Sequence, residues 1–239
     1  MILLSIITVV YNAENVIKQT INSVKSQKYP YYEHIIIDGG SKDLSLQIIG
    51  KMSYDKMICY SEPDRGIYDA MNKGLKKAKG DYVIFLNAGD EFASNTVTKY
   101  VVENISKHGL YYGNSLRIYE DKIVMFNEKI NSLSLTRHNI CHQSIFYPTD
   151  ELKKIGFDEK YRIFADWATN IKLYGTLKFN YINIPICKYK MNGISSTEDR
   201  NKDIPFLTDL PFLSKNYLGF LPYLFVKIRF TLRKLLWQN

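Results

Sequence analysis

Four short apolar runs in the first 90 residues alternate with three stretches of helical periodicity. The runs, most of them rich in β-branched side chains, cover residues 2–10, 35–37, 57–60 and 82–86. Each is too short to span a membrane, and such runs are typical of strands buried on both faces of a parallel sheet. Between them, apolar residues recur three and four positions apart, which predicts helices. The order β-α-β-α-β-α-β therefore predicts an α/β fold with a mostly parallel, doubly wound sheet flanked by helices.

The pattern after residue 91 is different and predicts a mixed α/β half. The elements expected there are a helix over residues 97–105, strands over 110–114 and 115–127 with a turn at Glu120-Asp121, helices over 149–155 and 166–174, and a strand over 179–184. No internal repeat or clear linker separates the two halves. We therefore expect one domain over residues 1–204, made of the halves 1–91 and 92–204, and a basic tail over 205–239.

The chain carries a net charge of +8, which indicates an anionic partner: a nucleotide phosphate, a nucleic acid or a lipid surface. Half of this excess lies in residues 205–239, where five lysines and arginines accompany one aspartate. The three cysteines are widely separated, which favours a reducing compartment. No charged-then-apolar signal precedes the first strand, so we expect a protein that faces the cytosol.

Polar residues directly follow the apolar run at 82–86, in the order Asn87, Ala88, Gly89 and Asp90. The run itself is preceded by a polar loop and a helix over residues 61–78. Open α/β sheets bind their ligands beyond the carboxyl ends of the strands. These residues are therefore predicted to form part of a binding site.

Two local motifs allow more than one interpretation. The sequence Asp38-Gly39-Gly40-Ser41 opens a helix and suits either a phosphate-binding turn or, more often, a tight strand-to-helix turn. It matches neither the Gly-x-Gly-x-x-Gly nor the Walker pattern. The group His138, Cys141 and His142 suggests zinc, but no second cysteine pair accompanies it, so a loop that faces a polar substrate is favoured.

Several motifs occur together in a fixed order: Ser5-Ile6-Ile7-Thr8-Val9-Val10-Tyr11-Asn12, Ile36-Ile37-Asp38-Gly39-Gly40-Ser41-Lys42-Asp43, Glu62-Pro63-Asp64-Arg65-Gly66-Ile67-Tyr68-Asp69-Ala70-Met71-Asn72-Lys73-Gly74, Phe85-Leu86-Asn87-Ala88-Gly89-Asp90, Cys141-His142-Gln143, Phe157-Asp158-Glu159 and Phe164-Ala165-Asp166-Trp167. This ordered set closely resembles glycosyltransferase family 2, the inverting sugar transferases of GT-A fold. The resemblance covers residues 1–195. It implies a Rossmann-like sheet with a nucleotide-sugar-binding first half and an acceptor-side second half.

The resemblance also implies which residues bind the nucleotide-sugar donor. The base and ribose would be held by the loops after the first two strands, and the Arg65 guanidinium suits the phosphate or the base because its planar fork binds in a bidentate manner. The donor-binding residues implied are Val9, Tyr11, Asp38, Gly39, Arg65, Asp69, Asn72, Asn87, Ala88 and Gly89.

The family's Asp-x-Asp motif binds a divalent cation, Mn²⁺ or Mg²⁺, that bridges the donor diphosphate. A hard cation with oxygen ligands neutralises the leaving group as the glycosidic bond breaks. This chain departs from the motif, because Asp90 is the single carboxylate at the expected place and Glu91 follows it. Asp90 is therefore the implied metal ligand.

Inversion by direct displacement requires a general base for the acceptor hydroxyl. The resemblance assigns this role to Asp166, whose alternative role is that of a carboxylate near the start of a helix. His142, Gln143 and Trp167 would lie on the acceptor side.

The implied activity is transfer of a sugar from a nucleotide-diphosphate donor, a UDP-sugar, to a glycan or lipid-linked acceptor in bacterial surface polysaccharide synthesis. A hexosyl- or N-acetylhexosaminyl-transferase is the type expected. The alternatives are a non-catalytic relative that binds the nucleotide sugar or a glycan, suggested by the reduced acidic motif, and a nucleic-acid binder, suggested by the charge. The second is disfavoured because the charge is concentrated in the tail and no nucleic-acid motif is present.

The tail has two interpretations. After Pro222, the residues Leu224, Phe225, Ile228, Leu232, Leu235 and Leu236 fall on one helical stripe with lysines and arginines beside or away from it. This pattern predicts an amphipathic helix in a membrane interface, and hence a peripheral protein at the cytoplasmic face of the inner membrane. Alternatively the helix packs on the catalytic domain, because Val226, Phe230 and Trp237 widen its apolar surface.

Overall fold

The structure is a computed structural model of residues 1–239, and it describes residues 1–120, 122–127, 129–190 and 203–237, the last five of these by their backbone alone. The turn predicted at Glu120-Asp121 includes residue 121, which lies outside the described residues. So do the side chains of Leu235 and Leu236 in the predicted stripe, and that of Trp237, which was expected to widen the apolar surface.

The first half forms the predicted parallel sheet, in the order β3 (Met57–Ser61), β2 (Tyr32–Asp38), β1 (Leu4–Val10) and β4 (Tyr82–Phe85). β1 lies between β2 and β4, and all seven of its residues are buried. Burial on both faces is why β1 and β4 are almost continuously apolar, whereas β3, at the edge of the sheet, has four of its five residues exposed and is not the doubly buried strand predicted for residues 57–60. The prediction of a parallel α/β sheet is therefore confirmed.

Helices α1 (Ile17–Lys25), α2 (Ser45–Lys51) and α3 (Ile67–Lys77) connect these strands. α3 packs closely on the sheet through Met71 and Gly74. A Cβ atom at Gly74 would lie 2.5 Å from Cγ2 of Ile7, so only glycine allows this approach. The short distance brings the start of α3 to the carboxyl ends of β1 and β2.

The second half extends the same sheet with antiparallel and parallel strands. β8 (Ile145–Pro148) runs antiparallel to both β4 and β6 (Leu110–Ile118), and β9 (Phe179–Lys190) runs parallel to β6. The edges are β5 (Glu91–Phe92), which pairs with β9, and β7 (Ile123–Phe126), which pairs with β6. The mixed character predicted for this half is confirmed.

Three details of the second half differ from the prediction. The strand break expected at Asn114/Ser115 is a register shift within the continuous β6, because the β6 pairing with β9 slips there. β9 continues to Lys190 rather than ending at residue 184. β5 and β8 were not predicted, because such short segments carry little periodicity. Helices α4 (Val97–Asn104), α5 (Thr149–Ile155) and α6 (Ala165–Tyr174) lie within one residue of the predicted ranges.

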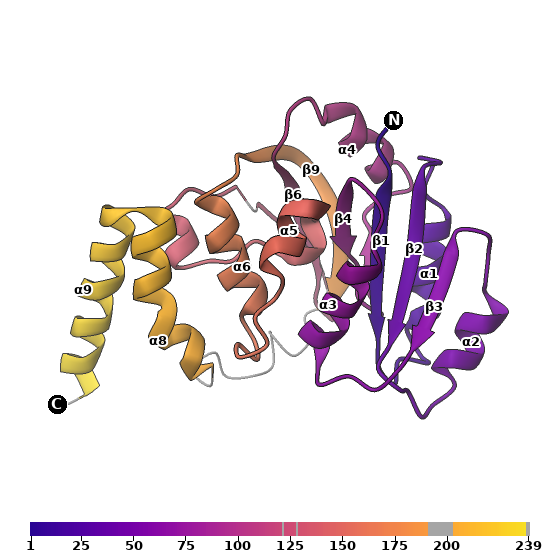
Figure 1. Cartoon of the computed structure of the whole chain (residues 1–239), viewed down its shortest axis with the longest axis horizontal. Coiled ribbons are helices and arrows are strands. Elements are labelled where there is room, and N and C mark those ends of the chain that lie inside the picture. The colour runs from indigo at the N-terminus through magenta and orange to yellow at the C-terminus, as the bar shows by residue number, and fades with distance from the viewer. Residues whose placement is uncertain (121, 128, 191–202, 238–239) are drawn as a thin grey trace.

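The C-terminal residues form α8 (Ile204–Leu213), a π-helical turn (Ser214–Leu218) and α9 (Phe220–Trp237), which stand side by side at the end of the molecule opposite α2 (Figure 1). Phe206 of α8 is fully buried, with its ring centroid 5.0 Å from that of Trp167 and 5.2 Å from that of Phe164. Asp203 accepts hydrogen bonds from the backbone N–H groups of Ile163 and Phe164. Residues of α8 and α9 thus pack in the same hydrophobic cluster as those of α6.

α9 packs on the domain and is also exposed. Val226 is buried in the core and Phe230 packs against it, as in the second interpretation of the tail. Leu224, Ile228 and Leu232 remain 41–54% exposed. Among the described residues, no helix has the length and apolarity needed to cross a bilayer.

A buried histidine between β1 and β2 should make the fold sensitive to acid. Nε2 of His34 lies 2.9 Å from Thr8 Oγ1 and Nδ1 lies 3.0 Å from the Tyr54 hydroxyl, and burial lowers the pKa of His34 to about 3. Because the unfolded histidine, with its pKa near 6.5, takes up a proton first, stability is lost as the pH falls below that value. We expect the free energy of unfolding to drop by about 2 kcal/mol between pH 7 and pH 5.

Urea unfolding at several pH values measures this loss, with His34→Gln as the matched control, because glutamine retains hydrogen-bonding groups but does not titrate. The prediction fails if the variant loses as much stability between pH 7 and pH 5 as the natural chain does.

Candidate active site

The site lies at the carboxyl ends of β1, β2 and β4, where elements of the second half face them. From the first half come the loop at residues 87–90 after β4 and the start of α3. From the second half come the short 3₁₀ helix η2 (His142–Ser144) and the first turn of α6. The structure brings together five of the predicted residues here through direct hydrogen bonds: Asn87, Asp90, His142, Gln143 and Asp166.

Asp166 is held by donors from four directions. Its Oδ2 accepts from Nδ2 of Asn139 at 2.8 Å and lies 3.1 Å from Nδ1 of His142. Its Oδ1 accepts from the Trp167 N–H at 2.8 Å and lies 3.0 Å from the Tyr68 hydroxyl. Burial and the neighbouring Asp166 carboxylate raise the pKa of Tyr68, so this hydroxyl stays protonated. The carboxylate is therefore fixed in orientation rather than free to rotate.

Two of these donors, Tyr68 and Asn139, were not predicted. Tyr68 lies on α3, in the first turn after the polar loop, and its single hydroxyl proton is shared between Asp166 and the Ile163 carbonyl, which lies 2.6 Å from the hydroxyl oxygen. Asn139 is oriented by Asn170 of α6, which donates to its side-chain oxygen at 2.8 Å. Nothing in the sequence shows that residues 68, 139 and 166 meet, because long-range packing brings them together.

Asp90 occupies a buried position behind η2. Its Oδ2 accepts from Nε2 of Gln143 at 2.9 Å, and burial raises its pKa to about 6 although this hydrogen bond and nearby His142 act in the opposite direction. The loop that carries it is shaped by Gly89, which has a φ of +99° and is held by hydrogen bonds with Gln19 and Thr20. A carboxylate in this environment favours a positively charged partner.

The residues at this loop fit a divalent cation of the type that takes most of its ligands from a diphosphate. Among the residues that the structure describes, no group of three His, Cys, Asp or Glu side chains is arranged to hold a metal by itself. This includes the zinc alternative at His138, Cys141 and His142. Mg²⁺ in phosphate-transferring sites uses one or two carboxylates together with substrate phosphates. Asp90 would supply such a carboxylate, and a cation would offset the charge that its burial disfavours.

The turn at residues 38–41 is closed by its own aspartate. Oδ2 of Asp38 accepts hydrogen bonds from the N–H groups of Gly40 and Ser41, each at 3.1 Å, and from Oγ of Ser61 at 2.7 Å. Because the turn's N–H groups are engaged in this way, the tight-turn interpretation is favoured over a phosphate-binding turn. A Cβ atom at Gly39 would lie 2.1 Å from Oδ2 of Asp64, so the two loops touch here.

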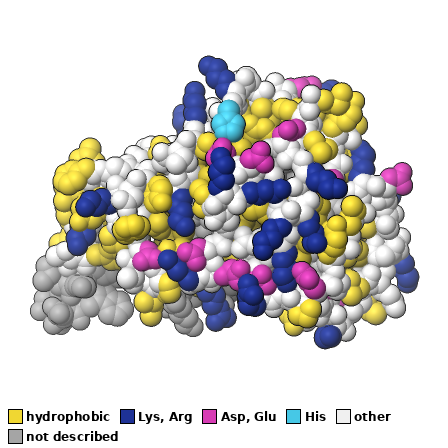
Figure 2. All heavy atoms as spheres, viewed as in Figure 1, with side chains coloured by type: hydrophobic (Ala, Val, Ile, Leu, Met, Phe, Trp, Pro, Cys, Tyr) yellow, Lys and Arg dark blue, Asp and Glu magenta, His cyan; other side chains and the backbone are white. Residues whose placement is uncertain are grey.

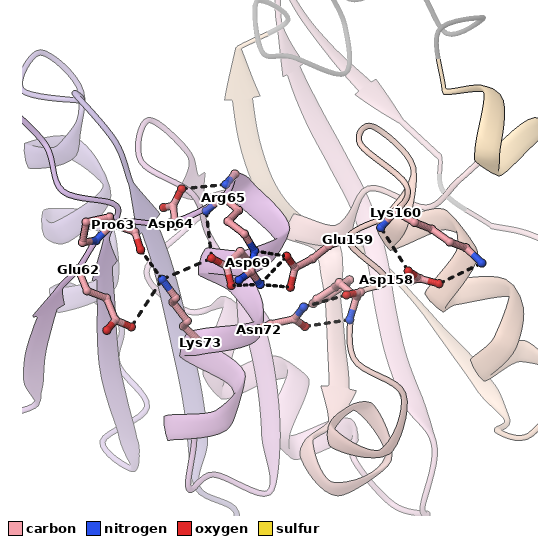
Figure 3. A network of polar contacts seen from close by, with 12 residues as sticks. Glu62, Pro63, Asp64, Arg65, Asp69, Asn72, Lys73, Asp158, Glu159 and Lys160 are labelled. Atoms are coloured by element: carbon pink, nitrogen blue, oxygen red, sulfur yellow. Dashed lines mark hydrogen bonds and ion pairs between the residues drawn. The ribbon is translucent and has the colours of Figure 1, made fainter.

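Arg65 lies in a network of ion pairs between the two halves, at the edge of the site (Figure 3). Its guanidinium is 2.8 Å from Oε2 of Glu159 and 3.2 Å from Oδ1 of Asp69, and Lys73 approaches Asp69 at 3.4 Å. Burial alone would raise the pKa of Asp69. The hydrogen bond from the Arg65 N–H and the charge of Lys73 outweigh burial and lower this pKa. The Arg65 side chain is 75% exposed, and exposed pairs of this kind contribute about 0–1 kcal/mol. The pairing with Glu159 is therefore weak enough to exchange for a phosphate.

Two predicted site residues have structural contacts instead. Asn72 donates to the Phe157 carbonyl and accepts from its N–H, at 2.8 and 2.9 Å, which joins α3 to the second half. Trp167 donates to the Leu135 carbonyl at 2.7 Å and packs in the core, so its ring does not line the acceptor side as expected. The sequence gives the position of an aromatic residue on a helix but not what packs against it.

The remaining predicted donor residues lie on the loops that follow the strands. Val9 is buried near the end of β1, and Tyr11 directly beyond that strand is 63% exposed. Ala88 donates its backbone N–H to the Val9 carbonyl at 3.1 Å, which continues the pairing of β1 with β4 into the loop. Tyr11 is thus an exposed ring at the mouth of the site.

A parallel sheet whose strand β4 ends in an acidic loop, opposed by a buried aspartate at a helix start, is the arrangement of the GT-A fold. The family comparison agrees with this class. The model of glycosyl transferase family 2 matches residues 5–176, and the chain belongs to that family. It is accordingly a glycosyltransferase.

Curated relatives extend over most of the chain. The "PGL/p-HBAD biosynthesis glycosyltransferase" of Mycobacterium tuberculosis is 30% identical over 221 residues, which are 88% of this chain and 85% of that protein. An uncharacterized glycosyltransferase of Haemophilus influenzae is 32% identical over 210 residues, 81% of this chain and 84% of that protein.

Solved structures share the fold at low identity. The crystal structure of S. aureus TarS 1–349 with UDP-GlcNAc aligns with a TM-score of 0.75 at 18% identity, over 90% of this chain and 67% of TarS 1–349. The mannosyltransferase PcManGT of Pyrobaculum calidifontis, with GDP-Man and Mn²⁺, aligns with a TM-score of 0.63 at 14% identity, over 90% of this chain and 62% of PcManGT. The present chain covers 66% of the length of S. aureus TarS 1–349 in its crystal structure with UDP.

The buried Asp90 carboxylate gives a prediction on stability. Because its folded-state pKa of about 6 is above the ordinary 3.8, the folded state binds the proton more tightly, and stability is lost as the pH rises from 4 to 6. Asp90→Asn should therefore increase the free energy of unfolding at pH 7.5, by up to about 3 kcal/mol, and should have little effect at pH 4.

Urea unfolding in EDTA, and again with MgCl₂ and UDP, measures the effect. The cation should stabilise the natural chain more than Asp90→Asn. Equal stabilisation of both proteins would show that Asp90 does not bind the cation.

Proposed function

We propose that this enzyme transfers a sugar from a UDP-sugar to a hydroxyl group of a glycan or lipid-linked acceptor, with inversion at the anomeric carbon. The observation that carries the proposal is the direct hydrogen-bonded connection from the loop after β4, through His142, to the buried Asp166 carboxylate. It joins the donor side to a base candidate on the acceptor side. An α/β ligand site requires both at one sheet edge.

The nature of the donor is supported by the similar structures. TarS has been solved with UDP and with UDP-GlcNAc, which favours UDP and an N-acetylhexosamine, whereas PcManGT has been solved with GDP-Man. We assign the uridine side of the donor to the loops at Tyr11 and Asp38, and the diphosphate to the loop at Asp90 with Arg65 nearby. A cation held by Asp90, Mn²⁺ or Mg²⁺, would neutralise the diphosphate as it leaves.

Asp166 would act as the general base. As the acceptor oxygen forms its bond to the anomeric carbon, the hydroxyl proton passes to the carboxylate, and the bond to the nucleoside diphosphate breaks with its electron pair. Tyr68, Asn139 and the Trp167 N–H keep the carboxylate in place, so no reorientation is needed during the reaction. Gln143 keeps the Asp90 side chain in place on the donor side.

Replacement of the base tests this role. Asp166→Asn should leave UDP binding within a few-fold while it lowers the transfer rate about a hundred- to ten-thousand-fold, since that is the usual contribution of general-base catalysis. Calorimetry with UDP and a transfer assay over a panel of nucleotide sugars provide the two measurements.

UDP binding within a few-fold of the natural chain is the control for lost packing around Asp166. Transfer at a normal rate by Asp166→Asn would exclude the base role. A chain that binds UDP but transfers no sugar from the panel would favour the non-catalytic alternative.

We also propose that the enzyme attaches to the cytoplasmic face of the membrane through α9, as surface polysaccharide synthesis on a lipid-linked acceptor would require. Leu221, Leu224, Ile228 and Leu232 recur on one side of α9 and are 74%, 41%, 51% and 54% exposed. Figure 2 shows hydrophobic side chains gathered at this end of the molecule, with lysines and arginines among them. Apolar side chains bordered by cations suit anionic lipid headgroups.

Substitution on the exposed side of α9 tests the attachment. Leu224→Asn with Ile228→Asn should reduce co-sedimentation with vesicles of phosphatidylcholine and phosphatidylglycerol roughly ten-fold or more, because both side chains lose their apolar burial. UDP binding should be unchanged.

Leu44→Asn, 55% exposed at a distance from the tail, is the control and should bind vesicles normally. If the double variant binds vesicles as the natural chain does, α9 is not the attachment site.

A further inference from the structure

The contacts of His142 define which of its ring nitrogens carries the proton. A carboxylate only accepts hydrogen bonds, so the 3.1 Å contact between Oδ2 of Asp166 and Nδ1 of His142 requires a proton on Nδ1. On the other side of the ring, Nε2 lies 3.1 Å from Nδ2 of Asn87. An amide nitrogen only donates, so Nε2 must be the acceptor. The two hydrogen bonds are therefore donated in the same direction: Asn87 donates to His142, and His142 donates to Asp166.

We propose that His142 is a positioning residue, held as the neutral Nδ1–H tautomer, that couples the donor loop at Asn87 to the carboxylate of Asp166. The proposal deepens the function given above and rests on it for the roles of the donor loop and of Asp166. His142 need not touch either substrate in order to act in this way, since its two nitrogens are already engaged.

The second polar atom of Asn87 supplies the connection to the donor. Within the described part of the chain, Oδ1 of Asn87 is buried and has no hydrogen-bond partner. A buried hydrogen-bond acceptor without a partner is unfavourable. A hydroxyl group of the nucleotide-sugar donor that bound to Oδ1 of Asn87 would remove this desolvation penalty. Such a bond would also polarise the amide and strengthen its donation to His142, because linked hydrogen bonds reinforce one another. Binding of the nucleotide sugar at the donor loop would thus strengthen the hydrogen bond that His142 donates to Asp166.

This arrangement also gives a reason for the asparagine at position 87. A carboxylate at this position would accept rather than donate, and Nε2 of His142 would then need a second proton. The imidazole would become a cation between two carboxylates, which stabilises its charged form. The asparagine keeps the ring neutral and the chain directed toward Asp166. The asparagine at position 87 is in this sense matched to His142.

The tautomer is directly measurable. Long-range ¹H–¹⁵N spectra of the full chain report which imidazole nitrogen is protonated, and the signals of His142 are identified among the four histidines by their loss in His142→Gln. At pH 7.5 we expect a neutral ring protonated at Nδ1, and in Asn87→Asp a ring protonated at both nitrogens. A ring protonated at Nε2 alone in the natural chain, or an unchanged tautomer in Asn87→Asp, would overturn the proposal.

Kinetics separate positioning from mere packing. When asparagine replaces His142, its side-chain amide nitrogen takes the position of Nδ1. When glutamine replaces His142, its amide nitrogen takes the position of Nε2. His142→Asn should therefore retain a hydrogen bond to Asp166, while His142→Gln should lose it. We expect kcat for transfer to fall at least about ten-fold further in His142→Gln than in His142→Asn, with similar KM values for the donor. Equal kcat values in two variants of equal melting temperature would reduce His142 to a packing residue.

The two proposals fail in different ways. If Asp166→Asn transfers sugar normally, the assignment of the base is wrong, while the tautomer spectra still report on the chain of hydrogen bonds. If the spectra show Nε2–H, the coupling is wrong, while the loss of transfer in Asp166→Asn still supports the base.

Discussion

The burial of β1 on both faces is the constraint on which the rest of the structure depends. All seven residues of this strand are buried, with β2 on one side and β4 on the other. A polar side chain on such a strand needs a hydrogen-bond partner, as Thr8 has in His34, so most polar groups of the first half gather where the parallel strands end. Tyr11, Asp38 and the loop at residues 87–90 all lie there. The site is thus a consequence of how the sheet is buried, and its chemistry is carried by what the second half brings to the same edge.

The second half is joined to the first by hydrogen bonds that involve backbone groups, and these make the site rigid. Asn72 clamps Phe157 through both of its side-chain atoms, and β8 inserts antiparallel between β4 and β6. Asp203 then holds the turn before α6. Because these links surround Asp166, the carboxylate and its donors keep a fixed geometry without any ligand. That preorganisation is what electrostatic catalysis requires.

The sequence predicted the parallel strands, the helices between them and the residues of the acidic loop, because period and local polarity decide those features. It did not predict β8, a strand of four residues whose neighbours are set by the whole fold. Tyr68 and Asn139 were missed for the same reason, since their contacts with Asp166 join residues far apart in the chain. The resemblance implied an acceptor-side role for Trp167, and the contacts of its ring with Leu135 and the core could not be read from the sequence because packing decides them. The role of Asn72 was likewise decided by packing.

The stacking of Phe206 on Trp167 means that α8 supports the residue next to Asp166. A change in the buried face of α8 would therefore reach Asp166, the proposed base, through a single layer of aromatic rings. The outward side chains of α9 differ, because Leu224, Ile228 and Leu232 are 41–54% exposed. The C-terminal region is thus divided between a buried helix face beside Asp166 and an outward helix face in solvent, so substitutions on the second should disturb the surroundings of Asp166 less than substitutions on the first.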